Sequence, residues 1–349
     1  MKTLAVALAA FLLCFSIAAP MRAADETLTI FIWSEYMDPD LIKDFEKKHD
    51  IKVRMDFYES NEEMVAKLQS GGVGQYDLIV PSTYFVTSLK KLDLIRPLDK
   101  EAIPNLKNIS PEFASLDVDP EGEFIVPYQW GTSGLLVRYK DIESLKPSWD
   151  ILYNPEAEIG NMILFDTARD VIGSALKHLG YSINSTDLKE VEAAARLIME
   201  TKKRKAFFGF DGGVGGMNKV LSGVATVTQV YSGEGLRAQD EDPGVHYLIP
   251  EGGCEIWMDL LAIPKNAPNA AAAHKFINYI LEPEVGAQLS TYTLFATPNA
   301  AAMEFIPEEH RTNPFLYPSA EEIKKMEYMQ DLGEANRIYD EAWTMIKTQ

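Results

Sequence analysis

Cysteine is scarce in this chain, with only Cys14 and Cys254 among 349 residues. Cys14 lies in a stretch that we expect to be removed on secretion, so one cysteine would remain and no disulfide framework could form. The five histidines are also scattered, and no two lie four positions apart as a helical metal pair would require. The sequence therefore predicts no metal site and no cofactor.

Basic side chains are outnumbered: 33 Lys and Arg stand against 52 Asp and Glu, for a formal net charge of −19. A nucleic acid or an anionic membrane surface would be repelled by such a chain, so we expect neither as a partner. The acidity permits a cationic ligand. It does not require one, because many secreted proteins are acidic for solubility alone.

Long apolar runs are missing beyond the N-terminus, where Lys2 precedes an apolar stretch that ends in Pro20 and Arg22. That stretch is short for a membrane span, and the small residues Ala23 and Ala24 offer a cleavage point. We predict a signal peptide over residues 1–23. Because no other apolar run is long enough to span a membrane, we expect the mature protein to be periplasmic.

Sequence motifs of common enzymes are also missing. The glycines of residues 212–216 lack the Gly-Lys-Ser/Thr ending of a phosphate loop, so we interpret them as the entry to a helix. The chain has no Gly-x-Ser-x-Gly elbow either. Paired carboxylates occur throughout so acidic a chain and give a hydrolase no specific support, so we expect a protein without catalytic residues.

What the chain has is a regular alternation of strand and helix patterns. Such alternation predicts an α/β protein with a parallel sheet covered on both faces, and its length suggests about two domains. Ligands of these sheets bind at the carboxyl ends of the strands. Strands are predicted at residues 28–33, 51–57, 77–80, 162–165 and 224–231, and helices at 39–49, 60–70, 168–179, 187–202, 269–281, 283–291 and, as a closing helical region, 319–347.

Two further patterns are local. Ser60 and Glu63 have the spacing of a capping box that opens the second helix. Residues 127–134 contain Gly131 and Gly134 between two apolar stretches, which predicts a turn joining two strands at a crossover between domains.

The stretch 252–264 places an aromatic ring and an acid on one face of an apolar strand, because Trp257 and Asp259 are two positions apart. A buried carboxylate is costly alone, so Asp259 must cap a backbone, pair with a basic residue or bind a cationic ligand. A second strand ends similarly in Trp33-Ser34-Glu35-Tyr36. Rings and carboxylates together can hold alkylammonium groups. They can also hold sugars, and the residue types alone do not separate the two.

In their order along the chain, these motifs resemble those of the periplasmic spermidine/putrescine-binding proteins of ABC transporters. The matching segments include Trp33-Ser34-Glu35-Tyr36, the segments at residues 58–61, 76–84, 126–130, 165–170 and 257–264, and Thr297-Pro298-Asn299. The resemblance implies a two-lobed periplasmic binding protein fold of type II with the ligand cleft between the lobes. One lobe would combine residues 26–132 with 258–305, and the other residues 133–257 with 306–349.

The resemblance also implies a ligand site and partners. The ligand would be a polyamine or diamine, held between aromatic walls and acids and delivered by a monomeric protein to an inner-membrane permease; a sensing role at a membrane receptor stays open. Carried over position by position, the ligand-binding residues are Trp33, Ser34, Glu35, Tyr36, Ser82, Tyr84, Asp170, Tyr231, Glu234, Trp257, Asp259 and Phe295.

This chain departs from the spermidine-binding pattern at several of these positions. Thr167 stands where those members carry an acid, Tyr231 replaces an indole, Phe295 a tyrosine and Met329 a glutamine. Glu234 resembles the putrescine-binding members, whereas Trp257 is of the spermidine type. The resemblance therefore indicates the class of ligand but leaves the identity of the amine open.

Overall fold

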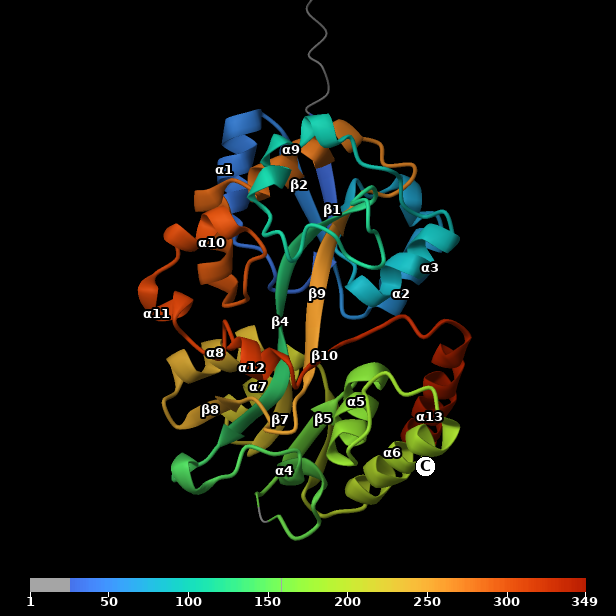
Figure 1. Ribbon diagram of the computed structural model, residues 1–349, viewed down its shortest axis with the longest axis vertical. Helices are drawn as coiled ribbons and strands as arrows, with labels where there is room; N and C mark the ends of the chain where they lie inside the picture. Colours follow the sequence, from blue (N-terminus) through green and yellow to red (C-terminus); the bar gives the residue numbers. More distant parts are fainter. Residues whose placement is uncertain (1–25, 158) are drawn as a thin grey trace, which may run out of the picture.

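The structure is a computed structural model that describes residues 26–157 and 159–349. The predicted signal peptide, residues 1–23, lies outside the described residues. The chain forms two α/β halves stacked along the long axis of the molecule (Figure 1). None of the helices in the described part of the chain is both long enough and apolar enough to cross a membrane.

The first half is built on three parallel strands, β1 (Thr27–Trp33), β2 (Lys52–Tyr58) and β3 (Leu78–Ile79). Helices α1 (Pro39–His49) and α2 (Asn61–Gln69) connect them, as parallel neighbours require. Because the strands are parallel, the residues that follow them meet at one edge of the sheet. The predicted strand and helix order is confirmed here to within about two residues.

Helix α1 shows how the local sequence sets these boundaries. The Asp38 carboxylate accepts a hydrogen bond from the Asp40 N–H at 2.9 Å, and Pro39 occupies the first turn, where a missing N–H costs nothing. The helix buries Leu41 and Phe45. Asp38 also accepts a 2.8 Å hydrogen bond from Gln288 and so ties this N-terminus to α10 (Pro283–Thr293).

The capping box predicted for α2 forms only in part. The Ser60 hydroxyl accepts from the Glu63 N–H at 3.1 Å, but the Glu63 carboxylate accepts from the N–H of Glu59, not from that of Ser60. The prediction of a reciprocal box was therefore wrong, although the helix begins at Asn61, next to the predicted Ser60.

Two long strands, β4 (Ile125–Arg138) and β9 (Glu255–Ala262), extend from one half into the other (Figure 1). They pair antiparallel with each other over residues 125–132 of β4, and the rest of β4 pairs with β7 (Val227–Tyr231) and β8 (Val245–Leu248). Antiparallel β9 also pairs with β3, so the sheet of the first half is mixed and not wholly parallel as predicted.

The turn predicted within residues 127–134 was wrong, because β4 is continuous there. Its glycines serve close packing instead. A Cβ at Gly131 would lie 2.5 Å from Cζ2 of Trp257, and one at Gly134 would lie 2.5 Å from the carbonyl oxygen of Leu248. Only glycine lets these neighbours approach the strand.

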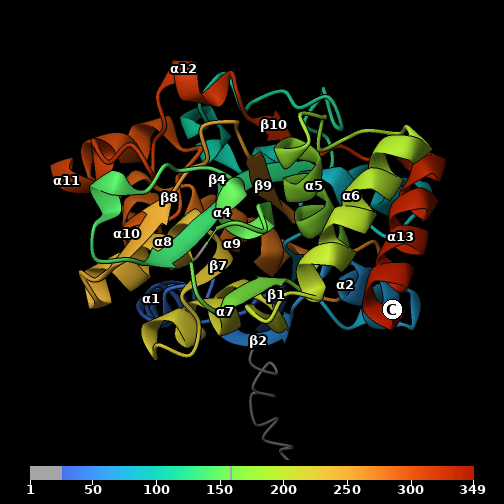
Figure 2. The ribbon, with the colours of Figure 1, turned by 90° about the horizontal axis from the view of Figure 1, so that it is seen from below.

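In the second half, β7 lies between β4 and β5 (Met162–Phe165), and β6 (Phe207–Asp211) pairs with the other side of β5. The sequence patterns did not predict β6 or β8, whereas the helix expected after Tyr231 is α8 (Ser232–Glu241). Seen from below, α6 and α13 lie side by side, with β8 and α8 at the opposite side (Figure 2). This half also contains the short helix α4 (Asp150–Tyr153) and the longer helices α5 (Ala168–His178), α6 (Leu188–Lys202) and α7 (Gly213–Leu221).

The C-terminal part of the chain visits both halves. Helices α9 (Ala270–Ile280) and α10 pack in the first half, whereas α13 (Asn336–Thr348) packs against α6 in the second. The closing helical region predicted over 319–347 was wrong in its middle. There α12 (Ala320–Ile323) is short, and β10 (Glu327–Tyr328) pairs with β9 in a parallel bridge that takes these residues out of any helix.

Replacing Asp38 by Ala should lower the free energy of unfolding by about 1–2 kcal/mol, because the N-cap and the bond to Gln288 are lost together. Urea unfolding of the purified protein measures the change. Asp40→Ala is the matched control, since this exposed residue pairs only with Lys43 and should unfold like the parent. Equal midpoints for the two variants would contradict the capping role of Asp38.

Candidate functional site

The edge where the strands of the first half end brings Asp259 and Ser82 together. The Ser82 hydroxyl donates to Asp259 Oδ1 at 2.6 Å, and both residues are buried. Asn61, at the start of α2, holds Ser82 in place: its Oδ1 accepts from the Ser82 N–H and its Nδ2 donates to Ser82 Oγ, both at 3.1 Å. The same Nδ2 donates to the Tyr84 hydroxyl at 3.3 Å. Asn61 therefore positions two predicted site residues, although the sequence reading did not single it out as one.

Asp259 has no ion-pair partner anywhere in residues 26–157 and 159–349. Burial raises the pKa of its carboxyl to about 7, and the hydrogen bond from Ser82 only partly opposes this. Burial raises the pKa of the Tyr36 hydroxyl well above its usual value, and the nearby charge of Asp259 raises it further. This hydroxyl makes no hydrogen bond of standard geometry. Of the three roles that the sequence left open for Asp259, a basic partner is thus removed, and the role of cation ligand remains.

Aromatic rings form one continuous wall beside this acid. The ring centroids of Tyr36 and Phe295 lie 5.4 Å apart, those of Trp257 and Phe295 4.9 Å, and those of Tyr231 and Trp257 5.7 Å, all edge to face. Gly233 allows this packing, since a Cβ there would lie 2.5 Å from Cε1 of Phe295. The structure therefore brings these four predicted residues together.

Three polar atoms in and beside this wall are buried without a hydrogen-bond partner: the Tyr36 hydroxyl, the Trp257 indole Nε1 and Glu234 Oε2. Such atoms are uncommon in folded proteins, because an unpaired buried donor or acceptor costs about 1–3 kcal/mol. Three predicted site residues therefore carry polar atoms that the rest of the described chain leaves unpaired.

Asp170, in the first turn of α5, accepts hydrogen bonds from Thr167 at 2.6 Å and from the Tyr231 hydroxyl at 3.1 Å. Thr167 stands where the spermidine-binding members carry an acid, and in this chain it orients the carboxylate of Asp170. The interaction also links Asp170 to the aromatic wall.

Glu255 is an acid of this region that the sequence reading missed. It is buried, accepts from Ser133 at 2.9 Å, and its pKa is raised well above the usual range by burial first and by the charge of Asp170 second. Both acids line a cavity of about 10 Å³, which Met329 also borders and which is no larger than one water. The alternation of side chains along the strand could have identified Glu255, because it places Glu255 on the same face as Trp257 and Asp259.

Glu234 lies in the first turn of α8 and is buried. Burial raises the pKa of its carboxyl to about 7, with Arg237 opposing the shift. Arg237 also pairs with Glu35, Nη1 to Oε2 at 3.4 Å, across the two halves of the molecule. Glu35 itself adopts the left-handed region at φ 54° and is about half exposed.

The remaining predicted residues lie around this cluster with other bonds. The Trp33 indole donates to the Val80 carbonyl at 2.9 Å and packs on Tyr58, so its ring is fixed by the first half. Ser34 donates to Glu59 in an exposed pair. The Arg169 guanidinium of α5 lies 5.7 Å from the centroid of the Tyr84 ring and so makes a second contact between the halves.

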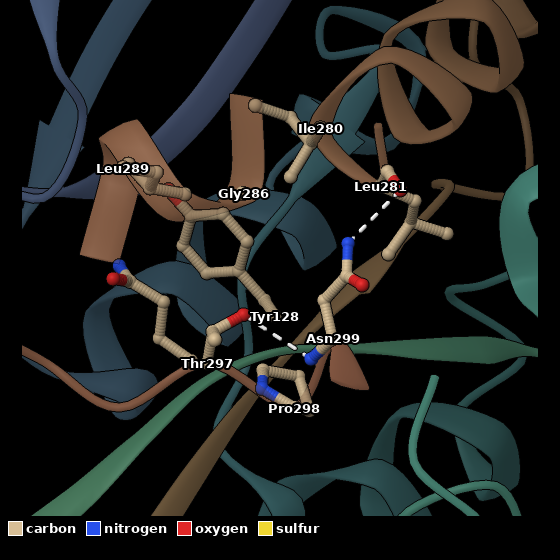
Figure 3. A pocket seen from close by; sticks show the side chains of 9 residues that line it. Tyr128, Ile280, Leu281, Gly286, Leu289, Thr297, Pro298 and Asn299 are labelled. Carbon is tan, nitrogen blue, oxygen red and sulfur yellow. Dashed lines mark hydrogen bonds between the residues drawn. The ribbon is translucent and has the colours of Figure 1, made fainter. Parts of the chain in front are cut away.

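Another cavity, bordered by Tyr128, Leu289 and Asn299, is too small for a ligand, at about 10 Å³ (Figure 3). Its wall is held by Asn299, whose side chain donates to the Leu281 carbonyl at 2.9 Å and whose N–H donates to Thr297 at 3.1 Å. Tyr128 borders it and donates through its hydroxyl to the Tyr36 carbonyl at 2.8 Å. This region therefore supports the backbone of Tyr36.

No group of three or more metal-ligating side chains could hold an ion within the part of the chain that the structure describes. The site is thus an arrangement of acids, hydroxyls and aromatic faces, which can bind cations and hydrogen-bond donors.

Residues 40–314 match the family model of bacterial extracellular solute-binding proteins. The chain belongs to this family. It is 36% identical over 341 residues, 97% of each chain, to the spermidine/putrescine-binding periplasmic protein of Escherichia coli (strain K12). It is 32% identical to a putrescine-binding periplasmic protein of Pseudomonas aeruginosa (strain UCBPP-PA14), over 100% of this chain and 99% of that one.

Solved structures agree with this assignment. A protein from Listeria monocytogenes superposes with a TM-score of 0.85 at 34% identity, covering 93% of this chain and 99% of its own. A spermidine/putrescine ABC transporter substrate-binding protein from Streptococcus pneumoniae gives 0.78 at 30% identity, covering 92% and 98%. The chain therefore has the two-lobed periplasmic binding protein fold, and the predicted fold class is confirmed.

The raised pKa values of Asp259 and Glu234, each about 7, predict how stability depends on pH. In the unfolded chain these groups titrate near 4, so the folded protein binds extra protons between about pH 4 and 7 and loses stability as the pH rises through 7. Each group should contribute a loss on the order of 1 kcal/mol between pH 6 and 8.

Urea unfolding of the ligand-free protein at pH 6 and pH 8 measures this loss. In the double variant Asp259→Asn/Glu234→Gln neither position titrates, and the difference between the two pH values should shrink by the same amount. A pH dependence identical in both proteins would show that these carboxyls are already ionised at pH 6.

Proposed function

We propose that this chain is a periplasmic solute-binding protein that captures a diamine or polyamine of the putrescine/spermidine class and delivers it to an inner-membrane ABC permease. The observation that carries the proposal is Asp259, a buried acid without a basic partner, beside the unpartnered polar atoms of Tyr36 and Trp257. The names of relatives that match nearly the whole chain support it.

The physical case rests on what would satisfy such an acid. A buried carboxylate is stabilised by a cation that donates hydrogen bonds to it, and an alkylammonium also lies favourably against aromatic faces. A charged hydrogen bond contributes about 1.5–3 kcal/mol and a cation over a ring about 0.5–2 kcal/mol. Two ammonium groups bound in this way approach the roughly 8 kcal/mol of a micromolar complex.

Sugars are the alternative that the residue types left open. Hydroxyl groups would satisfy the unpartnered atoms, but they bring no positive charge to a site with several acids. Asp259, Glu234, Glu255 and Asp170 all lie in or beside the cluster. Two basic groups act on these four acids, Arg237 on Glu234 and Arg169 on Glu255. The charge balance therefore favours an amine.

We further propose that the lobes divide as the sequence predicted, with residues 26–132 and 258–305 in one and residues 133–257 and 306–349 in the other. The pairs Arg237–Glu35 and Arg169–Tyr84 would then cross the ligand cleft. Closure of the lobes over the amine would bury it and create the surface that the permease recognises. The protein would act as a monomer, after loss of its signal peptide, and without turnover of its ligand.

Amines should stabilise the purified mature protein against heat, and sugars and neutral amino acids should not. At 100 times its dissociation constant a ligand adds roughly 2.7 kcal/mol to the free energy of unfolding. A thermal-shift panel of putrescine, cadaverine, spermidine, maltose and glycine measures this. Stabilisation by maltose alone would overturn the amine assignment, and recovery of a chemically altered amine would overturn the absence of turnover.

Asp259→Asn should weaken amine binding at least tenfold, because the shape is kept while a charged hydrogen bond worth about 1.5–3 kcal/mol is lost. Calorimetry of putrescine and spermidine measures the dissociation constants. Asp119→Asn is the matched control: this buried acid accepts from the N–H groups of Phe124 and Ile125, so it should cost stability but not affinity. A reduced melting temperature with unchanged affinity in Asp259→Asn would make Asp259 a structural residue.

A further inference from the structure

Arg237 is placed unusually for a basic residue in a site of acids. It lies one helical turn after Glu234 on α8, and its Nη1 is 3.4 Å from Glu35 Oε2 in the other half of the molecule. Its side chain is 23% exposed, and its Nε is buried without a hydrogen-bond partner. The guanidinium is therefore paired with Glu35 and lies close enough to Glu234 to lower the pKa of that carboxyl, although no hydrogen bond or ion pair joins Arg237 to Glu234 in the described residues.

The acids of the site differ in whether a basic side chain of the protein forms an ion pair with them. Within the described ranges, Glu35 is the only predicted site acid that forms an ion pair with a Lys or Arg. Asp259 and Asp170 accept only hydroxyl hydrogen bonds. Arg169, near Asp170, directs its guanidinium to Gln330, Asn336 and Asn184, none of which is charged. Arg237 thus places a positive charge paired with a carboxylate at the end formed by Glu35 and Glu234, whereas the Arg169 guanidinium acts on Glu255 through space and is hydrogen-bonded to neutral groups.

We propose that Arg237 is a specificity-determining residue, whose guanidinium takes the place between Glu35 and Glu234 that a further ammonium of a longer polyamine would need. This inference rests on the proposed amine-binding function. Arginine keeps its charge at every pH at which proteins fold. It would therefore neutralise these acids permanently and repel a second cation at the same end.

The consequence is that the site takes a diamine in preference to a triamine. A diamine can place its two ammonium groups at Asp259 and Asp170 and leave Arg237 undisturbed. A triamine must put its additional charge beside the guanidinium or leave it outside the acids. Selectivity of this kind comes from a repulsive element and not from an added contact.

The ion pair with Glu35 also joins the two halves, so a loss of Arg237 could weaken closure as well. The two roles have different signatures. Weaker closure lowers the affinity for every ligand by the same factor, whereas loss of the repulsion changes the ratio of the triamine to the diamine dissociation constant. The ratio is therefore the informative measurement.

Calorimetry of putrescine and spermidine with the mature protein and three variants tests the proposal. In Arg237→Gln the ratio of the spermidine to the putrescine dissociation constant should fall by roughly tenfold, the worth of one charged hydrogen bond. Arg237→Lys keeps the charge and should keep the ratio of the parent. Arg196→Gln makes the same substitution on the exposed face of α6 and should change nothing.

An unchanged ratio in Arg237→Gln, with both amines still bound, would overturn this proposal and leave the proposed function standing. If the parent binds neither amine, the proposed function itself fails, and this inference with it. A third ligand, 4-aminobutyrate, adds one more outcome. If it binds the parent more tightly than putrescine and binds Arg237→Gln poorly, Arg237 is a carboxylate contact and does not select by repulsion.

Discussion

The cost of burying carboxylates without counterions is the constraint on which this molecule depends. Asp259 lies in the middle of β9, which pairs with both β3 and β4, and among the described residues it has hydroxyl neighbours but no basic partner. The fold tolerates this because the acid can hold a proton, as its pKa of about 7 indicates. A folded protein that keeps such a buried group without a counterion is poised for a ligand that carries positive charge, since a bound cation removes the penalty that burial imposes.

The architecture around this acid serves two requirements at once. Strands β4 and β9 are paired with each other and extend into both halves, so they provide a continuous support for the site. Small residues on them and beside them let rings approach the backbone, as Gly131 does for Trp257 and Gly233 for Phe295. The contacts of Arg237 with Glu35 and of Arg169 with Tyr84 are side-chain contacts between the halves, and such contacts can break without disturbing either sheet.

Charge is distributed unevenly along the site, and this has consequences for the ligand. Arg237 pairs with Glu35 near Glu234, Asp259 accepts from the Ser82 hydroxyl, and the buried Glu255 lies beside the partly buried Asp170 with Arg169 close by. A ligand with evenly spaced ammonium groups meets a different environment at each. Length selection in such a site depends on which acids the protein has already neutralised.

The sequence by itself determined the elements and the residue types of this protein. Periodicity and capping residues defined α1 to the residue, and the aromatic and acidic residues that follow the strands indicated the chemistry of the site. The family was also evident from the ordered motifs, because they extend over nearly the whole chain. The local pattern was misleading where strand pairing decides the structure. The glycines of β4 predict a turn, yet pairing with β9 keeps this segment extended. The residues of β10 have a helical pattern, yet they form a strand because they pair with β9.

Only the tertiary structure decided which acids have partners. Asn61, Glu255 and Arg237 become part of the site through contacts with residues far away in the chain, and no periodicity reports such contacts. Asp259 could have paired with many basic residues, and the sequence could not say that it pairs with none of those in residues 26–157 and 159–349. The physical reason is that propensity and hydrophobic pattern are local properties, whereas the energy of a buried charge depends on everything that the fold brings within a few ångströms of it.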